Sequence, residues 1–506
     1  MRKEQILRSA TSSVIQIVVA SVVLFFLYKT LLRSLGPGDL GVWSLVLAIT
    51  SIAQVANLGI TGSIVKYVAT YQATNDTEKL TILIETATLT VCVVFLALMP
   101  LAYLAGRYLL HFALEGVSYV AAVSILPHAL VAFWIMMVTS IFQSALYGMH
   151  QVPLRNLLLI ADSILYLVAC SFLAPKFGLS GLATARVFVN AFILFANWIA
   201  LKRHIPGLPF TPRRWNKGVF REIAGYSLNL QIISLLTILC DPVTKGLMSR
   251  YGSISAVGYY EMANRMIQQC RSLLVNANQV LIPEFAHLSA LAPEKITAVY
   301  IRSYRLLYYL ALPLFSAIIA AAPVISVFWI GRYERDFALS SIILGIGWLL
   351  NTLCVPAYFA SLGTGDLRWN VRSHTAMGVL NVILGLALGS FFGSYGVIAG
   401  WMVSLIVGGA MLGLAYHVEN GISLKELLPA SSRLLTLFCL CGTAVSCGAL
   451  FDSRYGLTER ALDLVTFSVL MAIVTQAWFH PMRREIFGWV RSMKKRLIQP
   501  QSLPYL

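Results

Sequence analysis

Apolar runs of 17 to 25 residues recur from one end of this chain of 506 residues to the other. Each run is long enough to cross the roughly 30 Å hydrocarbon core of a bilayer as an α-helix. Lipid offers the backbone no hydrogen bonds, so segments inside it must satisfy their own by being helical. The composition agrees, with 58% hydrophobic and 12% charged residues. These features predict an all-α polytopic membrane protein.

The runs predict about 14 transmembrane helices with short connections, which leave no room for an extramembrane catalytic domain. The predicted spans lie near residues 12–32, 40–60, 81–104, 117–147, 154–174, 179–201, 224–241, 257–282, 304–328, 338–362, 373–391, 396–417, 433–450 and 461–479. The first run follows Arg2, Lys3 and Arg8 but is too long for the apolar core of a cleaved signal peptide. We therefore expect an uncleaved first span.

The distribution of Lys and Arg predicts the orientation, because cytoplasmic loops are the basic ones. With a cytoplasmic N-terminus, most of the 38 Lys and Arg residues fall on the inner side. The two richest inner segments are the central loop (Lys202, Arg203, Arg213, Arg214, Lys217, Arg221) and the C-terminal tail (Arg483, Arg484, Arg491, Lys494, Lys495, Arg496). The basic residues fall on the inner side only if the polar stretch 258–283 also crosses the membrane. Otherwise the basic tail would lie outside. We expect both termini to be cytoplasmic.

The formal charge of +17 in a soluble protein would suggest nucleic-acid binding. In a membrane protein it is better explained by the positive-inside rule and by attraction to anionic inner-leaflet lipids. In the tail, Ile486, Val490, Met493 and Leu497 recur at helical spacing between basic residues. Residues 481–506 are therefore predicted to form an amphipathic helix on the inner leaflet, the alternative being a solvated charged tail.

The two halves of the chain resemble each other at an offset near 216 residues. Phe177-Gly178-Leu179-Ser180-Gly181 precedes the sixth span and Phe392-Gly393-Ser394-Tyr395-Gly396 precedes the twelfth. Gly36 and Gly41 likewise find counterparts in Gly252 and Gly258. The repeat predicts an N-lobe at 1–201, a basic cytoplasmic linker at 202–223, a C-lobe at 224–417 and two further spans at 418–480. Parallel repeats place the substrate site at the lobe interface, with alternating access by rocking of the lobes.

Three charges lie inside the polar eighth span, at Glu261, Arg265 and Arg271. A charge at this depth is costly, so it usually faces a cavity or a partner. Glu261 and Arg265 are four residues apart and share a helix face, which leaves open an internal ion pair that only fixes packing. Arg271 lies about 240° further round than Arg265 and has no acidic residue at helical spacing. Such a cation suits an anionic ligand.

Other charges are weaker candidates for the site. Arg186 and Asp162 fall within the sixth and fifth spans and are predicted either to serve the cavity or to pair with each other. Lys29, Arg33 and Lys66 lie near the ends of the first two spans, where snorkelling to the headgroups is the alternative to substrate binding. The candidates for ion or proton coupling are Glu261, Asp162 and Glu85.

The sequence carries no P-loop, HExxH, CxxC or G-x-S-x-G motif, and its eight histidines are scattered without metal spacing. The eight cysteines lie in or beside apolar segments, which argues against a disulfide framework. We expect no cofactor, no metal site and no enzymatic activity.

Several stretches are similar to one known family: SLGPGDLGVWSL after the first span, LGITGSIVKYVA, YGMHQVPLRN, and YGSISAVGYYEMANRM leading into the eighth span. Across the whole chain they resemble the polysaccharide-transporter (Wzx-type) flippases of the MOP superfamily. The resemblance implies a bacterial inner-membrane protein that moves an undecaprenyl-pyrophosphate-linked oligosaccharide from the cytoplasmic to the periplasmic leaflet. The glycan then enters O-antigen, capsule or exopolysaccharide assembly.

Related flippases use a cationic central cavity, and the resemblance implies this role for Arg265 and Arg271 in the eighth span. Lys29, Arg33, Lys66 and Arg186 are the cations available in the first lobe. The implied partners are the lipid-linked oligosaccharide and, in the same pathway, a glycan polymerase and glycosyltransferases. The fourteen spans also resemble the lipid II flippase, whose last two helices form a lipid groove.

Two alternatives stay open. A multidrug exporter of the same superfamily would prefer cationic drugs and an acidic cavity, which the cations of the eighth span oppose. A membrane glycan polymerase or ligase would present a long outer loop with catalytic residues, and every predicted outer loop is short. The sequence specifies neither the sugar repeat nor the ion that drives transport.

Overall fold

The computed structural model describes residues 3–53, 60–74, 76–279, 281–428 and 433–451. The predicted fourteenth span, near 461–479, and the predicted tail helix, 481–506, lie outside the described residues. The chain divides into two compact units. The first contains Met1–Gln269 and Asn370–Gly408, and the second contains Cys270–Trp369 and Gly409–Leu506.

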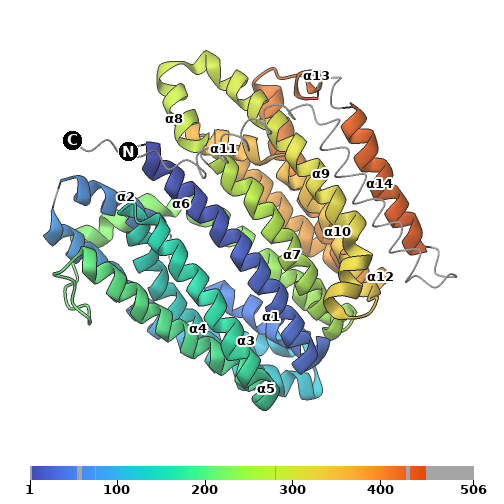
Figure 1. The fold of residues 1–506 in the computed structure, drawn as a ribbon, viewed down its shortest axis with the longest axis horizontal. Coiled ribbons are helices and arrows are strands. Elements are labelled where there is room, and N and C mark those ends of the chain that lie inside the picture. Colours follow the sequence, from blue (N-terminus) through green and yellow to red (C-terminus); the bar gives the residue numbers. More distant parts are fainter. Residues whose placement is uncertain (1–2, 54–59, 75, 280, 429–432, 452–506) are drawn as a thin grey trace, which may run out of the picture. The chain divides into compact units, whose positions relative to one another are not determined.

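All regular secondary structure in this part of the chain is helical, which confirms the all-α prediction (Figure 1). The helices are α1 (Lys3–Ser51), α2 (Ile60–Ala73), α3 (Thr77–Ala113), α4 (Gly116–Gly148), α5 (Val152–His204), α6 (Lys217–Tyr251), α7 (Ile254–Gln279), α8 (Leu281–Leu291), α9 (Ile296–Ile330), α10 (Arg335–Thr352), α11 (Val355–Thr364), α12 (Arg368–Glu419), α13 (Leu424–Leu427) and α14 (Arg433–Phe451). A 3-10 turn at Pro293–Lys295 precedes α9.

Seven stretches of the described residues are long and apolar enough to cross a membrane: Thr11–Ser51, Thr77–Ala113, Gly116–Gly148, Val152–His204, Pro293–Ile330, Arg335–Thr364 and Arg368–Glu419. The fourth and last each contain two predicted spans with a non-helical glycine between them, at Gly178 and Gly393. The first contains the predicted span 12–32 and the described start of the span 40–60, with the non-helical Gly36 between them. The polar helix α7 has 26 residues, about 39 Å at 1.5 Å per residue, so it is also long enough to span a bilayer.

Two sharp reversals confirm the sequence echo around Gly178 and Gly393. Gly178 has φ 59° and ψ −138°, and Gly393 has φ 62° and ψ −146°, a region that glycine enters without strain. A Cβ atom on Gly181 would collide with the carbonyl of Leu173, and the same holds for Gly396 and Leu388. Residues eight apart in a straight helix are about 12 Å apart, so α5 and α12 each fold back as a tight hairpin.

The other glycine pair of the echo meets in a reciprocal contact inside the first unit. A Cβ atom on Gly41 of α1 would lie 3.2 Å from the amide nitrogen of Gly258 of α7, and one on Gly258 would lie 3.2 Å from the amide nitrogen of Gly41. The same atoms would collide with the carbonyls of Ile254 and Pro37, respectively. Helices in membranes approach this closely only through small residues. Gly41 and Gly258 therefore allow α1 and α7 to pack closely against each other.

The core of the first unit lies among α2, α3, α4 and α5. Buried apolar residues there include Leu83, Val91, Ile141, Ala145 and Leu201. Lipid is as apolar as these side chains, so dispersion and shape complementarity stabilise the contact more than the hydrophobic effect does. Large apolar side chains such as those of Phe172 and Phe188 are exposed, as expected for surfaces that face lipid.

Helix α6 continues beyond predicted span seven, near 224–241, to Tyr251, and passes two charged residues, Asp241 and Lys245. Asp241 and Lys245 are one turn apart and form an ion pair of 2.7 Å. Because each charge has a partner, the helix continues through both.

In the second unit α9 packs against α10 and α14 (Figure 1). Tyr308 and Leu312 of α9 meet Leu435 and Cys439 of α14, and the hydroxyl oxygens of Tyr308 and Thr436 are 2.6 Å apart. Predicted span ten, near 338–362, is broken into α10 and α11 at residues 353–354. A proline in the first turn of α11, at position 356, accounts for this break because it lacks an amide hydrogen.

Candidate functional site

Glu261 of α7 is the centre of a buried ion cluster in the first unit. Its side chain is only 2% exposed, and each of its two carboxylate oxygens contacts a different cationic side chain. Oε2 lies 2.8 Å from Nζ of Lys245 on α6, and Oε1 lies 2.7 Å from Nε of Arg265 on α7. The hydroxyl of Tyr28 on α1 also donates to Oε1 at 3.0 Å. One carboxylate thus connects three helices.

The cluster is electrically balanced. Lys245 also pairs with Asp241, so two carboxylates meet two cations. A buried charge is tolerated only when it is paired and hydrogen-bonded, and Lys245, itself 2% exposed, satisfies both conditions. This arrangement stabilises helix contacts and needs no external ion to balance it.

The ion pair between Glu261 and Arg265, which the sequence left open, is present in the structure. Arg265 nevertheless keeps 48% of its side-chain surface exposed. Its guanidinium has five N–H donors, and Glu261 engages Nε, so Nη1 and Nη2 can still donate to a ligand. Substrate binding by Arg265 stays a prediction, and the positive charge of Arg265 is already paired with the carboxylate of Glu261.

Arg271 lies in the second unit and has a different environment. Its Cζ lies 4.4 Å from the ring centroid of Trp348 on α10, and Nη2 donates to Oδ1 of Asn351 at 3.4 Å. Its buried Nε has no hydrogen-bond partner among the described residues. No carboxylate of those residues lies within ion-pair distance of it. A guanidinium stacked on a ring and lacking a counter-ion attracts anions.

Arg186 and Asp162 are paired across the α5 hairpin. Nη1 of Arg186 lies 3.4 Å from Oδ2 of Asp162, and Cζ of Arg186 lies 4.8 Å from the ring centroid of Tyr166. Both charged side chains are about four-fifths buried. The reversal at Gly178 brings them together, which confirms the pairing alternative. A role in substrate binding or in coupling stays a prediction.

The three cations predicted near span ends lie on α1 and α2. Nζ of Lys29 lies 5.7 Å from the ring centroid of Phe25, and Nζ of Lys66 lies 5.4 Å from that of Tyr67. Arg33 is exposed, one turn before the break at Gly36. Snorkelling and substrate binding both remain compatible with these positions.

Glu85, a candidate for ion coupling, is buried on α3 and binds the backbone of the central linker. Its Oε2 accepts the amide N–H of Arg213 at 2.7 Å and that of Arg214 at 2.9 Å. The hydroxyl of Thr86 accepts the amide N–H of Asn216 at 3.2 Å. These bonds hold residues 213–216 against α3, and a role of Glu85 in ion coupling stays a prediction.

Lys245, Asp241 and Trp348 were missed as site residues from the sequence. The spacing of Asp241 and Lys245, one helical turn inside an otherwise apolar helix, is a signal that could have identified the first two. No spacing in the sequence relates Trp348 to Arg271, since α10 and α7 are far apart in the chain. Among the described residues no cluster of His, Cys, Asp and Glu suits a metal ion.

The model of the family described as "Polysaccharide biosynthesis protein" matches residues 30–334. This range is more than half of the chain. Comparison with curated proteins finds no match.

Among solved structures, the lipid II flippase MurJ in an inward closed conformation matches with a TM-score of 0.72 and 14% identity, covering 94% of this chain and 99% of that one. A multidrug resistance MATE family transporter of the MOP superfamily, in an inward-facing conformation, matches with a TM-score of 0.66 and 14% identity, covering 81% and 98%. A MOP superfamily transporter from Pyrococcus furiosus matches with a TM-score of 0.55 and 13% identity, covering 80% and 95%. The fold is shared with flippases and drug transporters alike.

Proposed function

The chain belongs to the polysaccharide biosynthesis protein family, and from this premise we propose that it flips an undecaprenyl-pyrophosphate-linked oligosaccharide across the bacterial inner membrane. It is a multi-pass membrane transporter with the MOP-superfamily fold. In the proposal the lipid-linked glycan moves from the cytoplasmic to the periplasmic leaflet by alternating access, for O-antigen, capsule or exopolysaccharide synthesis. The proposed transport step makes and breaks no covalent bond.

The observation that carries the proposal is the environment of Arg271. A pyrophosphate cannot enter hydrocarbon without losing its hydration, which is very costly unless cations replace the water. A guanidinium offers a planar set of donors that matches phosphate oxygens in bidentate geometry. Among the described residues Arg271 has no counter-ion and one buried donor without an acceptor. We assign it the pyrophosphate, with Trp348 orienting its guanidinium.

The other predicted cations, Arg265, Arg186, Lys66, Arg33 and Lys29, are proposed as further contacts to the anionic headgroup. Arg265 ranks first because its guanidinium is half exposed. The proposed location, with both termini cytoplasmic, rests on the excess of Lys and Arg in the predicted inner loops.

The test uses a strain that lacks the gene and makes no surface glycan, complemented with variants of the chain. We expect Arg271→Ala to abolish surface glycan and Arg271→Lys to retain part of it, because a point charge remains. Arg332→Ala, which removes an exposed arginine from the α9–α10 connection, is the control and should export normally. Full export by an Arg265→Ala, Arg271→Ala double variant, at normal protein levels, would contradict the site assignment.

An exporter of cationic drugs is the second candidate, favoured by the likeness to a MATE transporter. Such a pump needs carboxylates free to bind a cation, but Glu261 and Asp241 are each paired with Lys245. If this candidate were correct, deleting the gene would lower resistance to cationic drugs while surface glycan stayed unchanged. A third candidate, a membrane glycan polymerase or ligase, would show glycosyl transfer by the purified protein.

A further inference from the structure

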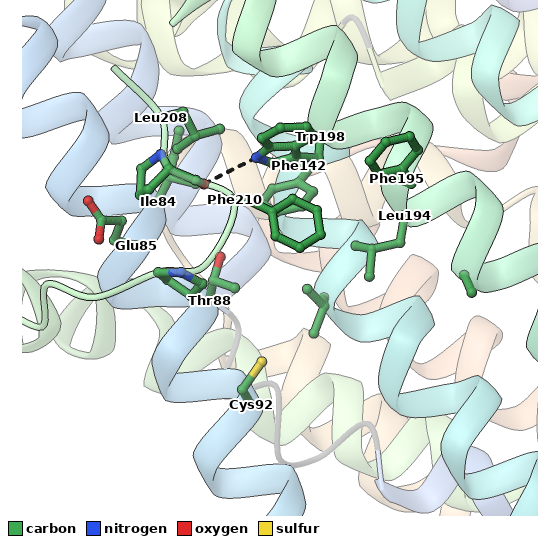
Figure 2. Close-up of a pocket in the computed structure, with 14 residues that line it drawn as sticks. Ile84, Glu85, Thr88, Cys92, Phe142, Leu194, Phe195, Trp198, Leu208 and Phe210 are labelled. Carbon is green, nitrogen blue, oxygen red and sulfur yellow. Dashed lines mark hydrogen bonds between the residues drawn. The ribbon is translucent and has the colours of Figure 1, made fainter. Parts of the chain in front are cut away.

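The central linker and the helices α3, α4 and α5 enclose an apolar pocket in the first unit. Its volume is about 290 Å³, near the lower end of the range for ligand sites. Figure 2 shows Glu85, Thr88 and Cys92 along α3 on one wall, facing Phe195 and Trp198 of α5 and Phe210 of the linker. Glu85 and Cys92 are seven residues apart, so the pocket follows α3 for about 10 Å.

The rim of this pocket is aromatic and partly exposed. The indole N–H of Trp198 donates to the carbonyl oxygen of Pro209 at 3.1 Å, which fastens the linker to α5 (Figure 2). The ring centroids of Trp198 and Phe210 are 5.0 Å apart, and Phe210 is 65% exposed. Nζ of Lys202 lies 4.7 Å from the ring centroid of Trp198. Aromatic and lysine side chains gather in this way at a membrane–water interface.

A second cavity of about 650 Å³ adjoins the first, since both are lined by Glu85 and Pro209. Arg213 and Arg214 line this second cavity, together with Glu78 and Thr81. The carboxylate of Glu85 is already bound to the linker amides. The side chains of Arg213 and Arg214 are exposed. They belong to the linker 202–223, which has six basic residues and one acidic residue, Glu222. The linker side of this cavity therefore carries an excess of positive charge, whereas the α3 side carries Glu78 and Glu85.

An apolar pocket that adjoins exposed arginines of the linker has the chemistry of one kind of ligand. We propose that this site holds an anionic phospholipid of the leaflet that the basic loops face, with an acyl chain in the apolar pocket and the phosphate at Arg213 and Arg214. A bound lipid would hold the linker against α3 and α5 at the point where Glu85 fastens it. This proposal does not depend on what the protein transports.

The test uses the full chain, purified and reconstituted into phosphatidylcholine vesicles with a trace of phosphatidylglycerol that carries a photoactivatable group in its acyl chain. After illumination, labelled peptides are identified by mass spectrometry. We expect labels on the pocket walls, within 84–92 or 194–210. The corresponding phosphatidylcholine probe should label these peptides far less, because each basic residue near the headgroup contributes roughly fivefold in affinity for an anionic lipid.

Two variants and two controls sharpen the result. Arg213→Gln with Arg214→Gln should reduce labelling about 30-fold at subsaturating probe, whereas Arg203→Gln with Lys217→Gln, the same loss of charge outside both cavities, should leave it nearly unchanged. Val138→Phe fills the apolar pocket and should also remove the label. Cys441→Phe, on an exposed position of α14, is the control for added bulk. Variants that keep the wild-type gel-filtration profile are compared.

Three outcomes would overturn the proposal. Equal labelling by both lipids would mean ordinary boundary lipid in the pocket. Displacement of the label by a polyprenyl phosphate, with no displacement by excess unlabelled phosphatidylglycerol, would mean that the pocket serves the polyprenyl chain instead. Labels confined to peptides outside the pocket walls would mean that the pocket holds no lipid.

Discussion

Nζ of Lys245 lies 2.8 Å from Oε2 of Glu261, and both side chains are only 2% exposed. The pair joins α6 to α7, and Arg265 and Tyr28 complete the coordination of the same carboxylate. The charged side chains around Glu261 thus stabilise the packing of α7 instead of destabilising it. The part of α7 that belongs to the first unit can pack there because both oxygens of its acidic residue lie within ion-pair distance of a cation.

This geometry predicts a large stability effect for Glu261→Gln. Loss of the carboxylate charge leaves Lys245 with Asp241 alone and Arg265 without its partner, which should cost about 3–5 kcal/mol. The measurement is thermal unfolding of the purified protein in detergent. Lys79→Met is a matched control, because the Lys79–Asp76 pair has a similar distance of 2.9 Å but is exposed, and should cost at most about 1 kcal/mol. Equal effects of the two substitutions would contradict the cluster's role.

The close contact of Gly41 and Gly258 predicts that α1 and α7 tolerate no side chain there. Gly258→Ala forces a Cβ atom against the carbonyl of Pro37 and should destabilise the protein by about 1–3 kcal/mol. Gly38→Ala is the control in α1, since its Cβ atom would lie 3.8 Å from the nearest atom, an ordinary contact. Unfolding temperatures of the two variants give the comparison. A neutral Gly258→Ala would show that the helices are less tightly packed.

The Arg186–Asp162 pair offers a test that separates structure from substrate binding. The exchange Arg186→Asp, Asp162→Arg preserves the pair across the hairpin, so we expect stability to change by no more than about 1 kcal/mol. If Arg186 only fixes packing, the exchanged protein should export glycan at a level close to wild type. Loss of export in a stably folded exchange variant would instead assign Arg186 to the substrate. Surface glycan and thermal unfolding are measured on the same variant.

Trp348 should matter to export through Arg271. Trp348→Leu keeps an apolar side chain but removes the ring that lies 4.4 Å from the guanidinium, so the arginine loses about 1–2 kcal/mol of stacking energy. We expect glycan export to fall about tenfold, and Trp348→Phe to restore part of it. The readout is the amount of surface glycan at equal protein level. Normal export by Trp348→Leu would show that the ring does not position Arg271.

Glu85→Gln distinguishes a linker contact from ion coupling. Glutamine keeps an oxygen that can accept from the amides of Arg213 and Arg214 but lacks the charge, so the expected loss is about 1 kcal/mol of stability with export retained. Glu85→Ala removes both bonds and should cost about 2–3 kcal/mol. Complete loss of export in a Glu85→Gln variant of normal stability would make Glu85 a coupling residue after all.

Local patterns in the sequence determined most of the fold. Long apolar runs require helices, because an unpaired backbone group in lipid is too costly. Gly178 and Gly393 end spans at equivalent places, because only glycine enters that backbone region without strain. The pair of Glu261 and Arg265 follows from residues one turn apart on one helix. Each of these inferences depends on neighbours in the sequence.

Only the tertiary structure determined which groups, distant in the sequence, contact each charged side chain. Lys245 reaches Glu261, Trp348 stacks on Arg271, and the Glu85 carboxylate receives the linker amides 128 and 129 residues later. No periodicity encodes these contacts, because in lipid the apolar pattern does not reveal which helix faces which neighbour. Their pairing depends on the rotation and depth of whole helices. The sequence showed where charges enter the membrane, and packing determined which of them are neutralised.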